Sequence, residues 1–148
     1  MSAGQLRPLP ETAKVFRLVP PIDGYYDAGR DKPHPTAFVL STEDRKQNPQ
    51  RLTVWDVART TVKQARRIHG NPDTKAFALD VLKIRQVGNE RLDVVEDPLP
   101  SNSGTGADGH CGITGLHRIS GEPKVERQYL RSRLADIAAP YHDNPGGG

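Results

Sequence analysis

The stretch that most constrains the fold is residues 51–70, RLTVWDVARTTVKQARRIHG, because its apolar spacing changes part-way along. In the first half, Leu52 and Val54 alternate with polar residues, and this spacing of two in a β-rich segment predicts a strand. Trp55 is the only tryptophan of the chain, and a large aromatic residue in such a strand is typical of a core anchor. The second half predicts a helix, so a strand leads directly into a helix.

The predicted helix covers residues 61–69. Thr61 and Gln64 have the spacing of a capping box, in which each side chain bonds the backbone N–H of the other residue. Gly70 and Pro72 are expected to end the helix. Its apolar stripe consists of Ala58, Val62, Ala65 and Ile68.

Other short segments with β-forming residues predict strands at 15–19, 37–40, 77–79, 92–96 and 110–116. The first is stopped by two prolines and is typical of an edge strand, and the second is expected to form a hairpin with the Trp55 strand. Residues 81–87 predict a short helix capped by Asp80, and a single helix over 74–87 is the alternative.

A last helix is predicted over 123–139 between two prolines. Its expected buried side consists of Tyr129, Leu130, Leu134, Ile137 and Ala138. These elements predict an α+β fold: a mainly antiparallel sheet of about four or five strands, with the short central helix and the C-terminal helix packed on one face. The core is expected to join Phe38, Trp55, Phe77, Val94, Ile113, Leu130 and Leu134.

The length of 148 residues favours one domain, which we place at 15–139, with flexible tails at 1–14 and 140–148. One cysteine excludes an internal disulfide and a cysteine-based zinc cluster. No apolar run has the length of a membrane span or a signal peptide, so we expect a cytoplasmic protein without membrane contact. No cofactor is expected.

Protein binding is the leading functional hypothesis. The proline-rich loop 20–36 carries Tyr25, Tyr26 and Arg30, and a long loop of this kind is often functional. Two predicted helices add basic faces, which contain Lys63, Arg66, Arg67, Arg127 and Arg131. We therefore expect a non-enzymatic accessory subunit that binds a co-encoded partner protein. The net charge of +3 also permits sequence-tolerant binding of nucleic acid.

A small hydrolase or nuclease is the catalytic alternative, with His110 acting together with Asp56 or Asp97, and with Arg30 as a further candidate. The string HCGITGL around His110 superficially resembles the histidine strand of NlpC-type papain-like peptidases. Those enzymes place their nucleophilic cysteine upstream, whereas no cysteine precedes His110 here. The five histidines form no i,i+3 or i,i+4 pair, so no metal site is expected.

Two further patterns concern the loop at 101–109 and the end of the chain. SNSGTGADG lacks the Lys-Ser/Thr of a phosphate-binding loop and is expected to be a flexible linker. The terminal glycines 146–148 are similar to the tail of a ubiquitin-like modifier, which is a further alternative function.

The strings AFVLS, RLTVWD, LDVVEDPLP and HCGITGL occur in this order around the predicted central helix. This order resembles a group of small uncharacterised bacterial proteins with the pattern LSV, helix, GLxVxxDP and HAxIxG. Residues 89–92 stand in place of the Gly-Leu turn of that pattern, and Cys111 occupies its small-residue position. The resemblance implies a bacterial origin and no transferable activity.

Overall fold

The computed structural model describes residues 6–143 and has an α+β fold, which confirms the expected class. A six-stranded antiparallel sheet has the strand order β6-β7-β4-β1-β5-β8. Its strands are β1 (Lys14–Val19), β4 (Arg51–Asp56), β5 (Lys75–Asp80), β6 (Asp93–Glu96), β7 (His110–Thr114) and β8 (Ala139–Pro140). A separate two-stranded ribbon pairs β2 (Tyr26–Asp27) with β3 (Lys32–Pro33).

Four α-helices accompany the sheet: α1 (Thr42–Arg45), α2 (Val62–His69), α3 (Val81–Val87) and α4 (Lys124–Ile137). Three short 3-10 helices are η1 (Pro35–Phe38), η2 (Ser101–Ser103) and η3 (Ala107–Gly109). The central helix begins with the expected capping box, because Gln64 N donates to Thr61 Oγ1 at 3.1 Å and Thr61 N donates to Gln64 Oε1 at 3.2 Å. It ends where Gly70 adopts a φ of +87°.

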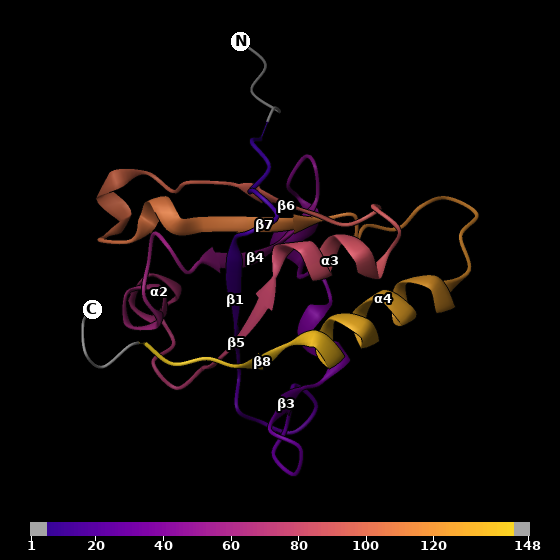
Figure 1. Cartoon of the computed structure of the whole chain (residues 1–148), viewed down its shortest axis with the longest axis horizontal. Coiled ribbons are helices and arrows are strands. Elements are labelled where there is room, and N and C mark those ends of the chain that lie inside the picture. Colours follow the sequence, from indigo (N-terminus) through magenta and orange to yellow (C-terminus); the bar gives the residue numbers. More distant parts are fainter. Residues whose placement is uncertain (1–5, 144–148) are drawn as a thin grey trace.

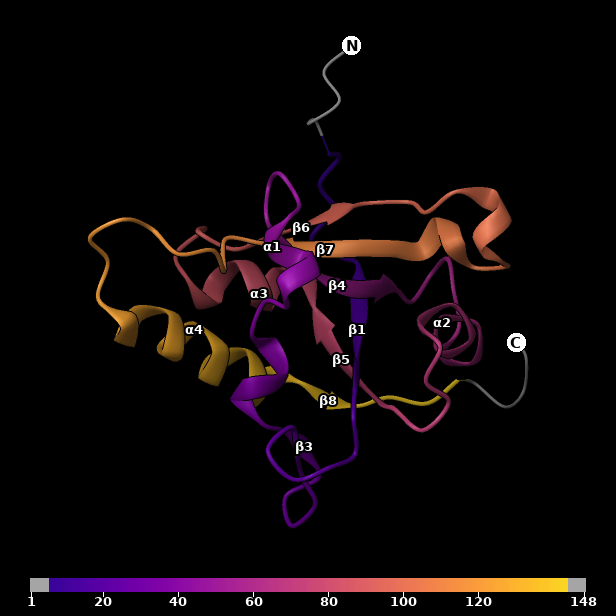
Figure 2. The same cartoon turned by 180° about the vertical axis from the view of Figure 1, so that it is seen from behind.

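The two main helices lie on opposite faces of the sheet, so the expectation that they share one face is wrong. α3 and α4 lie on one side of β1, β4 and β5, and α2 lies on the other (Figures 1 and 2). The residues of β1 alternate accordingly: Val15 and Val19 pack into the cluster under α4, whereas Phe16 packs into the cluster under α2. Side chains one apart on a strand point to opposite faces, and both faces of this sheet are covered.

The core is therefore split into two clusters. Phe38, Phe77, Val94, Ile113, Leu130 and Leu134 are all buried in the cluster on the α4 face, as expected. Trp55 is buried in the other cluster, together with Phe16 and Val62, so it does not meet those six residues. The prediction that all seven form a single core was wrong because it did not separate the two faces.

Two strand assignments also differ from expectation. Residues 37–40 form no strand, because η1 occupies Pro35–Phe38 and places Ala37 and Phe38 in the core as a tight turn. The Trp55 strand, β4, consequently has no hairpin partner there and pairs with β1 and β7. The segment expected as an edge strand, β1, is central, between β4 and β5.

Both segments expected to be tails are packed in part. Leu9 is buried, and its N–H donates to the carbonyl of Val94 at 2.9 Å. At the other end, β8 adds an edge strand to β5, and Tyr141 stacks on Phe16. The terminal glycines 146–148, on which the modifier hypothesis rests, lie outside the described residues.

Candidate functional site

The structure brings His110 together with Asp97 and not with Asp56. His110 opposes Trp55 in the register of β7 and β4, and their rings meet edge to face with centroids 5.0 Å apart. Asp56 follows Trp55 directly, so its side chain points to the other face of the sheet. It pairs there with Arg59 at 3.6 Å. Arg30 belongs to the turn between β2 and β3, and this ribbon lies away from β6 and β7 (Figure 1).

Asp97 connects His110 to Arg51. The His110 Nδ1 lies 2.8 Å from the carbonyl oxygen of Asp97, which can only accept, so Nδ1 carries the proton of this hydrogen bond. The carboxylate Oδ2 of Asp97 lies 3.5 Å from the same nitrogen and accepts from Arg51 Nε at 2.8 Å. The imidazole of His110, followed by the Arg51 guanidinium, lowers the pKa of Asp97 to about 2, although partial burial opposes this shift.

These three residues line a hollow of about 310 Å³ whose other walls come from the α1 region, β4 and the loop after β6. The glycine at 112 makes the arrangement possible, because a Cβ there would lie 2.8 Å from Cβ and Cδ of Arg51. Cys111 supplies no nucleophile: burial raises the pKa of its thiol to about 12, so the reactive thiolate is not formed near neutral pH. Chemically, the hollow offers a positioned imidazole base and no activated nucleophile.

The basic face of α2 surrounds a second hollow. This space of about 630 Å³ is lined by Lys63, Arg66, Arg67, Gly70 and Pro72. Arg66 is held in place by its Nε, which donates to the carbonyl of Thr74 at 2.9 Å. Within residues 6–143, none of the three cations lies within ion-pair distance of a carboxylate.

The other two basic residues singled out in the sequence, Arg127 and Arg131, lie one turn apart on α4. Both are half-buried, and their Nε atoms are buried without a hydrogen-bond partner in the described part of the chain. Burial, followed by the positive charge of Arg127, lowers the pKa of Arg131. The two residues form one local basic strip on α4, a helix that lies on the other side of the sheet from α2 (Figure 2).

The 20–36 segment is ordered against the body of the protein. Tyr26 packs its ring on Phe77, with centroids 5.9 Å apart, and donates its hydroxyl to Asp31 at 2.8 Å. Lys32 donates to the carbonyls of Asp136 and Ala138 just before β8. Of the residues expected to contact a partner here, Tyr26 is therefore engaged within the chain, whereas Tyr25 and Arg30 remain exposed.

The sequence did not reveal a third surface, which lies along α3 and α4. Tyr129 was expected to be buried, yet 54% of it is exposed, and Val125 one turn earlier is 60% exposed. The hollow between the two helices has a volume of about 320 Å³ and is lined by Lys83, Gln86, Val87, Tyr129, Arg133 and Ile137. Neighbouring residues on a helix point in different directions, and Leu130 is buried. A helical projection of the sequence could therefore have shown that Tyr129 points away from the core.

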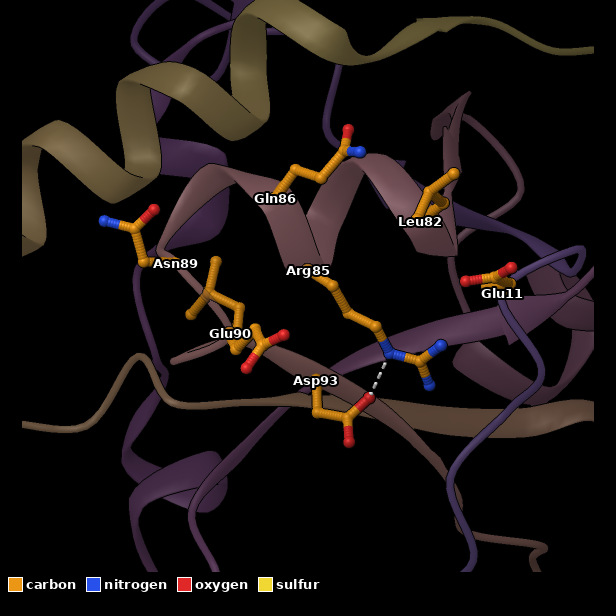
Figure 3. A pocket seen from close by; sticks show the side chains of 8 residues that line it. Glu11, Leu82, Arg85, Gln86, Asn89, Glu90 and Asp93 are labelled. Atoms are coloured by element: carbon orange, nitrogen blue, oxygen red, sulfur yellow. Dashed lines mark hydrogen bonds and ion pairs between the residues drawn. The ribbon is translucent and has the colours of Figure 1, made fainter.

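A neighbouring hollow of about 550 Å³ lies on the other flank of α3 (Figure 3). Leu82 and Gln86 line it from α3, and Arg85 reaches across it to Asp93, with Nε and Oδ1 2.8 Å apart. Figure 3 shows Gln86 pointing up toward α4, away from Arg85. Gln86 lines both hollows, and Leu82 is 40% exposed, so the outer side of α3 joins two concave surfaces.

In the described residues, no group of three or more histidine, cysteine, aspartate or glutamate side chains is placed to hold a metal ion. Across the same residues, no helix has the length and apolar character needed to cross a membrane. Comparisons of the chain with protein-family models, with curated proteins and with solved structures found no match. We therefore infer its function from its own surfaces.

Proposed function

We propose that this protein is a non-enzymatic binding module, an accessory subunit that docks a helical segment of a co-encoded partner protein between α3 and α4. The observation that carries the proposal is the exposure of Tyr129 and Val125, at 54% and 60%, beside the hollow between these helices. Large apolar side chains gathered on one exposed face commonly mark protein interaction sites, and tyrosine is enriched among the residues that dominate binding energy.

The charge of the hollow defines the partner segment. Lys83 and Arg133 are the charged residues among those that line it, and both are basic. Lys83 has the carboxylate of Asp80, at the end of β5, at 3.7 Å, and Arg133 has that of Asp136, on α4, at 3.7 Å. Both contacts are too long for a strong hydrogen bond, so both basic side chains can turn toward an incoming acid. The complementary ligand is an amphipathic helix with apolar residues at helical spacing and carboxylates beside them.

The test is a pull-down with the tagged protein from its native host, in which bound proteins are identified after nuclease treatment. We expect a stoichiometric co-encoded protein that the Val125→Ser/Tyr129→Ser double variant loses. Ile22→Ser is the matched control, because Ile22 is 57% exposed on the ribbon side of the molecule. If the Ile22→Ser variant loses the partner and the double variant retains it, the binding site lies in the 20–36 segment. That outcome would contradict binding at the groove between α3 and α4.

A photo-crosslinking amino acid at position 129 gives a second readout. Crosslinks should map to an acidic amphipathic helix of the same partner. Release of that partner at high salt alone would instead favour the basic faces of α2 and α4, because exposed charge pairs are screened by salt. Recovery of nucleic acid without protein would contradict the proposal.

The joined residues Arg51, Asp97 and His110 favour a hydrolase as the second candidate function. With Nδ1 bonded to the carbonyl of Asp97, the Nε2 of His110 is the nitrogen that can accept a proton from water. Arg51 would bind an anionic substrate or stabilise developing negative charge. A screen of phosphodiester and carboxylic-ester substrates tests this candidate. Activity that the His110→Gln variant lacks would support it, whereas equal activity of both proteins would exclude it.

A further inference from the structure

We propose that the hollow beside α2 binds the phosphate group of a small phosphate ester, at a site separate from the groove between α3 and α4. The hollow has a volume of about 630 Å³. The helix that lines it, α2, lies on the opposite side of the sheet from α3 and α4 (Figures 1 and 2). It is lined by Lys63, Arg66 and Arg67 from α2 and by Gly70 and Pro72 from the turn that follows. This inference does not depend on the proposed protein-binding function.

Arg66 is positioned before any ligand arrives. Its Nε and Nη2 both donate to the carbonyl of Thr74, a residue that is itself buried. This anchor leaves Nη1 and the second hydrogen of Nη2 without a partner in the described residues. A guanidinium held in one orientation loses little conformational entropy on binding, and its planar fork matches the geometry of phosphate oxygens.

The charge of the hollow is uncompensated within the described chain. Lys63 is three residues from Arg66 and four from Arg67, so the three cations share one side of α2 and repel one another. Elsewhere Arg51, Arg85 and Arg91 each pair with a carboxylate. A bound dianion would remove the repulsion on α2, which gives the site a reason to prefer phosphate over a monoanion.

The nearby acids do not neutralise the three cations. Asp143 accepts the backbone N–H groups of Val62 and Lys63 at 2.6 and 3.1 Å, and therefore occupies the first turn of α2. Asp31 lines a smaller adjoining hollow with Arg66, and its carboxylate accepts the hydroxyl of Tyr26 at 2.8 Å. Asp73 is exposed in the turn after the helix, beyond ion-pair distance of the three cations.

The size and walls of the hollow indicate an ester and not a bare ion. Its volume falls in the range of small-molecule sites, about 300–1,000 Å³. The Pro72 ring gives one wall an apolar surface, and a Cβ at Gly70 would meet no atom within 4 Å, so there is room for an organic group. No aromatic residue lines the hollow, and successive bases of a single strand would find no stacking platform there.

The test is a titration of the full chain with phenyl phosphate, inorganic phosphate and benzoate, followed through the Nε–Hε signals of its arginines. We expect phenyl phosphate to shift the Arg66 signal saturably and to bind about tenfold more tightly than benzoate. Inorganic phosphate should bind at the same place more weakly, because it lacks the organic group. Equal binding of phenyl phosphate and benzoate, or saturable shifts confined to arginines outside α2, would overturn the proposal.

Two variants and a competitor complete the experiment. Arg67→Gln and Lys63→Gln should each weaken phenyl phosphate binding about tenfold, and both residues are exposed, so the fold should be kept. Arg45→Gln, at an exposed arginine of α1, is the matched control and should bind as the parent does. Unchanged binding in both α2 variants would overturn the site. A short single-stranded oligonucleotide that displaces phenyl phosphate at lower concentration would overturn the small-ligand assignment in favour of nucleic acid.

Discussion

Asp143 caps a helix that begins 81 residues earlier in the chain, because its Oδ1 accepts the backbone N–H of Val62 at 2.6 Å. Its Oδ2 accepts the next N–H, that of Lys63, at 3.1 Å. The C-terminal segment therefore ties the edge of the sheet to α2. A negative side chain at this position also interacts favourably with the positive end of the helix dipole.

We expect Asp143→Ala to lower the free energy of unfolding by about 1 kcal/mol, the usual cost of losing a helix cap. Urea unfolding followed by circular dichroism measures the difference. Asp73→Ala is the control, because Asp73 is exposed and caps no helix. An unchanged midpoint for Asp143→Ala would show that the segment does not hold α2 in solution.

Truncation of Leu134 and of Tyr129, both on α4, should change the free energy of unfolding by very different amounts. Leu134 is fully buried, and Leu134→Ala should lower the free energy of unfolding by about 2–5 kcal/mol. Tyr129→Ala should change it by less than about 0.5 kcal/mol, because most surface substitutions have small effects. Thermal or urea unfolding of both variants checks the pair. A large loss of unfolding free energy in Tyr129→Ala would indicate that Tyr129 is buried in the core. The proposed groove would then lose its main evidence.

Stability should fall at acid pH through Asp97. The pKa of this carboxyl is lowered from 3.8 to about 2 in the folded protein, first by His110 and then by Arg51. A group with a lowered folded pKa stabilises the fold above its unfolded pKa, and the contribution is lost as pH falls from about 4 through 2. The contribution at neutral pH is about 2 kcal/mol.

Asp97→Asn should therefore flatten the dependence of unfolding free energy on pH below about 5. Urea titrations at several pH values compare the variant with the parent. The comparison variant is Asp73→Asn, which removes an exposed carboxyl that lies within 4 Å of no cation in the described residues. Parallel pH profiles for Asp97→Asn and the parent would contradict the ion pair.

The loop 101–109 should be sensitive to one added methyl group at Gly106. A Cβ there would lie 2.3 Å from Thr60 Oγ1, so the loop is packed against the start of α2. Gly121 has a similar positive φ with no atom within 4 Å of its Cβ position. Gly106→Ala should lower the free energy of unfolding by about 1–3 kcal/mol more than Gly121→Ala. Equal losses for the two variants would mean that the loop moves aside freely.

Local chemistry made several elements predictable. The capping box at Thr61 and the glycine at 70 act within one helix, so their residues define α2 without information from the rest of the chain. The alternation in β4 and the apolar residues of β5, β6 and β7 likewise predicted strands where they occur. The residues around 37–40 misled the prediction, because a short apolar run fits a strand and a buried turn equally well.

The candidate sites were less predictable, because their residues come from distant parts of the chain. The sequence named His110 and both Asp56 and Asp97, but only strand register decides that Asp97 shares a face with His110. The basic face of α2 was visible as a helical pattern, whereas the hollow beside it depends on the turn at Gly70. The exposure of Tyr129 depends on how α4 rotates against the sheet.

Local patterns along the chain were enough to predict the fold class, the ends of the central helix and the identity of most buried residues. These features follow from spacing, caps and turns, which act over a few residues. Three features became known only from the folded chain: β1 is central, α2 and α4 cover opposite faces, and Asp143 caps α2. Those choices are made by contacts between residues far apart in the chain, and no local pattern encodes which distant segment supplies a partner.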